Sequence, residues 1–218
     1  MMGWRSSRAA AALTLLALAS CGNEQAQLAN RANLTAALND FLAQRGHVCL
    51  AKYDWPITVK AVDRQARSLG AQQMAVLEAL GLTKGRDVSA TPEAGVGAAF
   101  TQTAREYVLT ADGQKYYLHV PVVIATATRH ITHPADFCAA TLSLDRLVGW
   151  EKPQALGERT VTSVLFTYRI APAPWTQTPD ARRVFPVVTN AVRNAGTSQL
   201  RLGMHLTRRG WIADELSE

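Results

Sequence analysis

Apolar residues recur at helical spacing in three stretches of the chain. In the first stretch, positions three or four residues apart are apolar: Leu34, Leu38, Phe41 and Leu42, with Leu28 before them. Such spacing gives a helix one apolar face, and Gly46 is placed to end this helix in a left-handed cap. A second helix is predicted over 71–80, with Gly81 as its stop. A third is predicted over 180–195, where Pro186 kinks the helix or begins a new one.

Extended segments are predicted where apolar and polar residues alternate or where β-branched residues gather. They lie at residues 47–53, 57–62, 138–150, 160–170 and 199–206. The clearest hairpin signal is formed by residues 106–110 and 115–124, which flank the turn Ala111-Asp112-Gly113. Residues 88–98 are rich in Gly, Ala, Pro and Ser and predict a surface loop.

The beginning of the chain has the pattern of an export signal. Arg5 and Arg8 precede an apolar run over 9–17, and Leu18-Ala19-Ser20-Cys21 closes that run. This arrangement resembles the lipobox of bacterial lipoprotein signal peptides, and the whole outline resembles exported bacterial lipoproteins of an uncharacterised family. The resemblance implies lipidation of the Cys21 sulfur. Gly22, at a position where Asp would favour the inner membrane, implies delivery to the outer membrane with the body facing the periplasm.

Two other interpretations of this segment stay open. An ordinary signal peptide would need small residues before its cleavage site, and Ala17 and Ala19 could serve. An uncleaved anchor would need roughly 20 apolar residues to cross a bilayer, and the run over 9–19 is about half as long. We therefore predict a signal peptide over 1–20 and a short polar, lipidated tether over 21–27.

The composition of the chain limits the classes of partner that it can bind. Apolar residues make up 48% and charged residues 18% of the sequence, which excludes disorder for most of it. Two of the 23 basic residues lie in the signal segment, so 21 remain against 17 acidic residues and the excess is +4. This surplus is compatible with a position near anionic lipid or cell-wall polymer. It is too diffuse for nucleic acid, which needs clustered basic side chains.

The hairpin signal and the helix before it form a second local resemblance. Residues 71–118 resemble the end of the recognition helix and the wing of winged-helix domains. A DNA-binding role conflicts with export, and the candidate helix offers Gln72, Gln73 and Glu78 but no basic residue before Lys84. The resemblance therefore implies a packing or protein-binding unit.

These elements together predict an α+β protein. We expect an N-terminal α+β module over 28–128, made of the first helix and the winged-helix-like unit. An antiparallel β-sheet module with one packed helix follows over 129–218.

Three cysteines remain to be placed. If Cys21 carries lipid, Cys49 and Cys138 are the only free pair, and an oxidising periplasm favours a disulfide between them. The bridge would close a loop of roughly 90 residues and tie the two modules together. The alternative makes Cys49 a nucleophile with His47 as its base, but a reduced thiol is hard to maintain in that compartment.

His130, His133 and Asp136 form the best candidate metal site in the sequence. Zinc uses such ligands, but a catalytic site also needs a third well-placed ligand and an open coordination position. A spacing of three places both imidazoles on one side only in a helix, and Pro134 favours an exposed loop instead. We expect neither a metal nor another cofactor.

The sequence predicts a membrane-anchored envelope lipoprotein that binds a protein or peptidoglycan partner and is not an enzyme. Four tryptophans could rim a groove for such a partner, or fill the core: Trp55, Trp150, Trp175 and Trp211. The alternative function is a periplasmic metal-assisted hydrolase that uses His130, His133 and Asp136. An inhibitor of a cell-wall enzyme is a third hypothesis, although the sequence shows no insertion loop for it.

Overall fold

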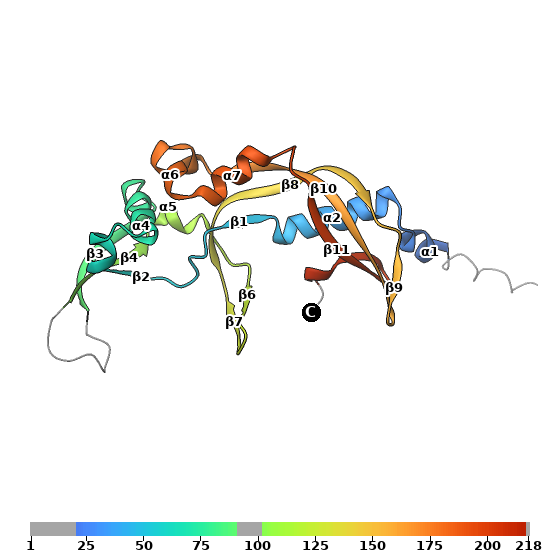
Figure 1. The fold of residues 1–218 in the computed structure, drawn as a ribbon, viewed down its shortest axis with the longest axis horizontal. Coiled ribbons are helices and arrows are strands. Elements are labelled where there is room, and N and C mark those ends of the chain that lie inside the picture. Colours follow the sequence, from blue (N-terminus) through green and yellow to red (C-terminus); the bar gives the residue numbers. More distant parts are fainter. Residues whose placement is uncertain (1–20, 91–101, 217–218) are drawn as a thin grey trace, which may run out of the picture.

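The computed structural model describes residues 21–90 and 102–216, and its shape is elongated (Figure 1). Its largest sheet has seven antiparallel strands. Five of them follow the order β1 (His47–Cys49), β8 (Asp136–Trp150), β10 (Arg159–Pro172), β11 (Leu200–Thr207) and β12 (Gly210–Ala213). In addition, β5 (Tyr117–Leu118) pairs with β8, and β9 (Gln154–Leu156) pairs with β10. The predicted α+β class with antiparallel sheets is confirmed.

Two smaller sheets accompany the large one. One has the order β2 (Ile57–Lys60), β4 (Gln102–Leu109) and β3 (Thr83–Ala90), and the other consists of β6 (Val122–Ala125) and β7 (His130–His133). The helices are α1 (Cys21–Gln27), α2 (Arg31–Arg45), α3 (Ala61–Gln65), α4 (Leu69–Ala79), α5 (Ala111–Gln114), α6 (Pro179–Val184) and α7 (Pro186–Asn194). Two 3₁₀ turns complete the fold, η1 (Pro174–Gln177) and η2 (Asp214–Leu216).

Helix α2 forms where the sequence predicted it, and it covers one face of the large sheet. Asn30 caps its first turn by accepting a hydrogen bond from the amide of Asn33 at 2.9 Å. Its apolar face is buried in one hydrophobic cluster with β8, β10, β11 and β12, and that cluster includes Leu34, Leu38, Leu42, Val164, Phe166 and Met204. The left-handed cap was wrong, because Gly46 has a φ of −74°. A side chain there would collide with the carbonyl of Leu42, so glycine serves close packing instead.

A second hydrophobic cluster fills the other end of the molecule. It joins α4, α6, α7 and the three-stranded sheet to the first residues of β8, and its largest side chains include Met74, Leu77, Phe137, Trp175 and Phe185. Pro186 begins a new helix, α7, directly after α6 ends. Of the two predicted outcomes, a kink or a new helix, the second is confirmed. Gly81 follows α4 with a φ of +73°, which confirms its role as a helix stop.

The predicted hairpin over 106–124 is wrong. Residues 111–114 form one helical turn, capped by the Thr110 hydroxyl, which accepts from the Gly113 amide at 3.1 Å. Because the Thr110 side chain caps these residues, they form a helical turn and not the predicted Asp-Gly hairpin turn. Strand β4 pairs with β2 and β3, whereas β5 pairs with β8 and β6 with β7. The two segments that were expected to form the wing therefore pair with different strands.

Strand pairing crosses residue 128, where we expected one module to end and the next to begin. Strands β1 and β5 precede that boundary and pair with β8, which follows it. The expected tether over 21–27 is the helix α1, which lies against β12. Of the predicted loop over 88–98, residues 88–90 belong to β3 and residues 91–98 lie outside the described part.

Candidate functional site

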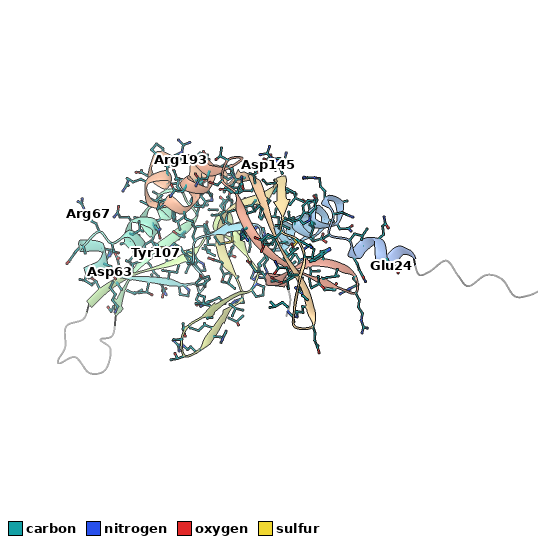
Figure 2. The ribbon with its side chains drawn as sticks, turned by 45° about the vertical axis from the view of Figure 1, so that its right-hand side comes forward. Glu24, Asp63, Arg67, Tyr107, Asp145 and Arg193 are labelled. Atoms are coloured by element: carbon teal, nitrogen blue, oxygen red, sulfur yellow. A yellow bond between two sulfur atoms is a disulfide. The ribbon has the colours of Figure 1, made fainter. Side chains whose placement is uncertain are left out.

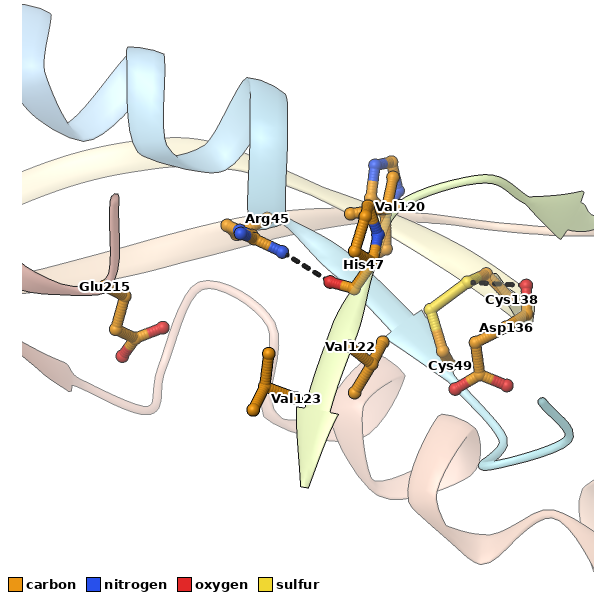
Figure 3. A pocket seen from close by; sticks show the side chains of 10 residues that line it. Arg45, His47, Cys49, Val120, Val122, Val123, Asp136, Cys138 and Glu215 are labelled. Atoms are coloured by element: carbon orange, nitrogen blue, oxygen red, sulfur yellow. Dashed lines mark hydrogen bonds between the residues drawn. A yellow bond between two sulfur atoms is a disulfide. The ribbon is translucent and has the colours of Figure 1, made fainter. Parts of the chain in front are cut away.

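A pocket of about 490 Å³ lies between the β6–β7 hairpin and the large sheet. Figure 3 shows its lining, which comes from the end of α2, from β1, from the chain entering β6, from the start of β8 and from η2. The lining residues are Arg45, His47, Cys49, Val120, Pro121, Val122, Val123, Asp136, Cys138 and Glu215. The pocket therefore combines residues that are up to 170 positions apart in the sequence.

Strand alternation determines which side chains reach this pocket. Successive residues of a strand point to opposite faces. His47 and Cys49 of β1 therefore face the pocket, while Val48 between them packs against the second hydrophobic cluster. On β8, Asp136 and Cys138 line the pocket, and Phe137 is fully buried on the opposite side.

The cysteine pair forms part of the pocket wall. Cys49 and Cys138 lie directly opposite each other in the register of β1 and β8. Their sulfur atoms are at disulfide distance, as the predicted pairing requires. This places the bridge between neighbouring strands of one sheet, where it holds β1 against β8 at the floor of the pocket (Figure 3).

Asp136 supports the turn that follows β1. Its carboxylate accepts backbone N–H groups from Ala51 at 3.1 Å, Lys52 at 2.7 Å and Phe137 at 2.7 Å. Ala51 has a φ of +54°, which a residue with a side chain rarely adopts, and the carboxylate holds it there. Burial raises the pKa of Asp136 above its usual value, although the three hydrogen bonds and Lys52 oppose this.

His47 is the second titratable group in the pocket wall. Its Nδ1 atom is buried and has no hydrogen-bond partner among the residues that the structure describes. Burial lowers the pKa of this imidazole, because the charged form loses hydration.

The outer wall of the pocket is apolar, and its rim is charged. Arg45 donates a hydrogen bond to the carbonyl of Pro121 at 2.8 Å, which fixes the chain entering β6 over the sheet. Val123 is 60% exposed and lines the pocket on the β6 side. Arg45 and Glu215 bring opposite charges to the same opening.

The three candidate metal ligands are not brought together. His130 is exposed at one end of β7, and residues 130–133 form a strand where we expected a loop. His133 stacks on the ring of Tyr53 with 4.2 Å between centroids, and its Nδ1 lies 3.1 Å from Asp54 Oδ2. The Asp136 carboxylate is occupied by backbone amides. Within residues 21–90 and 102–216, no group of three or more His, Cys, Asp or Glu residues could hold a metal ion.

The four tryptophans belong to the hydrophobic clusters instead of rimming one groove. Trp55 and Trp175 pack in the cluster around Phe137, and Trp150 and Trp211 pack in the cluster under α2. The sequence had singled out His47, both cysteines and Asp136 for other reasons. It missed Arg45, Glu215 and the segment 120–123, whose β-branched residues were assigned to the predicted hairpin.

Comparison of the chain with protein-family models, with curated proteins and with solved structures found no match. Across the described ranges 21–90 and 102–216, no helix is long and apolar enough to cross a membrane. The function must therefore be proposed from the residue pattern at the start of the sequence and from the chemistry of the pocket.

Proposed function

We propose that the protein is a lipoprotein of the bacterial envelope, anchored through Cys21 to the periplasmic face of the outer membrane. Its body binds a partner in the pocket beside β6 and catalyses no reaction. The pocket supports this proposal because its open side is walled by valines and rimmed by one arginine and one glutamate. Its volume of about 490 Å³ lies within the range of sites that hold small ligands or a few side chains.

The partner that fits this lining best is an extended protein segment. Apolar side chains of such a segment would replace water against Val120, Val122 and Val123, which gains free energy in proportion to the apolar area covered. Charged side chains at its ends would meet Arg45 and Glu215, which favours one orientation of the segment. A glycan of the cell wall offers less apolar surface to these valines.

A binding role suits the state of the polar groups in the pocket. The Asp136 carboxylate accepts three backbone N–H groups, and Arg45 donates to the Pro121 carbonyl. The two sulfur atoms are joined to each other. These groups support the local backbone, whereas a general base or nucleophile needs an atom that is available to the substrate. No observation favours the alternative hydrolase.

Replacing Cys21 by serine tests the anchor. We expect the Cys21→Ser protein to leave the membrane fraction, because the acyl-bearing sulfur is the proposed attachment. Membranes would be washed at high salt and the protein detected by immunoblot. A Cys21→Ser protein that still sediments with washed membranes would show that lipidation is not the principal attachment.

Site-specific photocrosslinking tests the pocket. A crosslinking amino acid would replace Val123, and the matched control would replace Val108, which is 43% exposed on β4 and does not line the pocket. After irradiation of intact cells, we expect an adduct to one envelope protein at position 123 and none at 108. Adducts of the same mass at both positions, or none at 123, would contradict the proposal. An adduct to peptidoglycan at 123 alone would assign the pocket to the cell wall instead.

A further inference from the structure

The helix that begins at Cys21 is fixed to the body of the protein. Trp211 donates its indole N–H to the carbonyl of Gln27 at 3.1 Å. Asn33 donates to the carbonyls of Gln25 at 2.8 Å and Leu28 at 2.9 Å, which holds the connection to α2. A lipid attached to Cys21 would therefore be attached to a body of defined orientation, and the surface beside α1 would lie next to the bilayer.

The surface beside α1 includes the turn between β11 and β12. Gly210 ends this turn with a φ of +121°, and a side chain there would lie 3.2 Å from the carbonyl oxygen of Ala26. Ala26 is five residues from Cys21, which is about 8 Å along a helix axis. Figure 1 shows α1 and the turn between β11 and β12 at the same end of the molecule. The anchor and the turn are thus held together.

The two central residues of this turn are Arg208 and Arg209. Both are exposed, and none of the ion pairs found within residues 21–90 and 102–216 involves either of them. The backbone of the turn is fixed, because the Thr207 hydroxyl accepts from the Arg209 amide at 3.2 Å and donates to the Gly210 carbonyl. On α1 itself, Glu24 is the acidic residue (Figure 2), so the two arginines of the turn outnumber the single negative charge of this helix.

We propose that Arg208 and Arg209 form a second membrane contact, which binds anionic phospholipid headgroups beside the lipid anchor and sets the orientation of the body. This inference rests on the proposed anchoring through Cys21. A surface charge is felt over about 10 Å at an ionic strength of 0.1 M, which is comparable to the spacing between anchor and turn. Each basic side chain at an anionic surface favours contact by roughly fivefold.

The protein itself contains a matched control. Arg182 and Arg183 are also adjacent in sequence and exposed, but they lie on α6, which Figure 1 places away from the end that carries α1. Arg183 pairs with Asp180 at 3.0 Å, and Arg182 donates to the Gln177 amide oxygen at 2.9 Å. The two pairs of arginines thus differ in their distance from the anchor and in their side-chain partners, so each arginine is compared with itself on the two kinds of vesicle.

The experiment uses the full chain, extracted from cell membranes in detergent and reconstituted into vesicles. One set of vesicles is phosphatidylcholine alone, and the other is an equimolar mixture with phosphatidylglycerol. Arginine side chains are modified with phenylglyoxal, and the rate at each site is followed by mass spectrometry. We expect Arg208 and Arg209 to react about fivefold more slowly on the anionic vesicles. Arg182 and Arg183 should react equally on both, and the difference should vanish at 1 M NaCl, where screening acts over about 3 Å.

A second measurement is needed because the rate of arginine modification can change without a membrane contact. Hydrogen exchange of the amides at 206–212 should be slower on the anionic vesicles in the parent, and equal on both in Arg208→Ser/Arg209→Ser. The Arg182→Ser/Arg183→Ser variant should behave like the parent. Equal rates on the two kinds of vesicle, with the protein retained on both, would overturn the membrane contact and leave the anchor standing. Failure of the parent to remain on either vesicle would overturn the anchor, and the contact with it.

Discussion

Removing the bridge between Cys49 and Cys138 should cost a large part of the stability of this protein. The two cysteines are 89 residues apart in sequence and are neighbours in the register of β1 and β8. The strands are already paired in the folded state, so the bridge acts mainly by restricting the unfolded chain. For a loop of this length, the chain-entropy relation gives about 4.5 kcal/mol. Typical domains are stable by about 5–15 kcal/mol.

Urea denaturation of the parent and of Cys49→Ala/Cys138→Ala measures this difference. We expect the midpoint to fall, and the slope with denaturant to rise, because the unlinked chain exposes more surface when it unfolds. The parent reduced with dithiothreitol is the control and should unfold like the double variant. If the parent and the double variant differed by less than about 1 kcal/mol, the entropic reasoning would be refuted.

Three further predictions concern the pocket and its neighbours. Asp136→Ala should destabilise the fold by at least about 3 kcal/mol, because three backbone N–H groups lose their acceptor; urea denaturation measures this, and an unchanged midpoint would contradict it. Burial lowers the pKa of His47, so its contribution to stability is present above about pH 6.5 and is lost as the pH falls through the folded pKa. Melting curves of His47→Gln should therefore show a weaker loss on acidification than those of the parent. His130→Ala/His133→Ala should cost about 1 kcal/mol, mainly from the stack on Tyr53, and a chelator-sensitive melting temperature in the parent would reopen the metal site.

The sequence predicted the long elements well because their periodicity extends over many residues. Helix α2 buries one face, and strand β10 and the second half of β8 alternate between more and less buried positions, so their apolar residues recur at alternate or helically spaced positions. The turn at Ala111-Asp112-Gly113 was predicted wrongly because Thr110 caps a helical turn there, and a cap and a hairpin turn use similar residues.

The pocket was not predictable in the same way. The cysteine pairing followed from compartment and parity, but Arg45, Val123 and Glu215 meet only through the arrangement of the sheet. No local pattern marks an exposed arginine as the donor that holds a distant backbone carbonyl. The hairpin prediction also assigned the segment 120–123 to a different strand pair, so the sequence did not predict this wall of the pocket.

The hydrogen bond from Trp211 to Gln27 spans 184 positions, and α2 packs on β12 at the opposite end of the chain. The hydrophobic cluster under α2 therefore cannot close until nearly the whole polypeptide is present, and contacts between distant segments slow folding because a long loop must be ordered first. During synthesis, α2 is made before the strands on which it packs. A chain with this topology stays unfolded until β12 has been made, which would suit the proposed export, because an exported chain crosses the membrane unfolded.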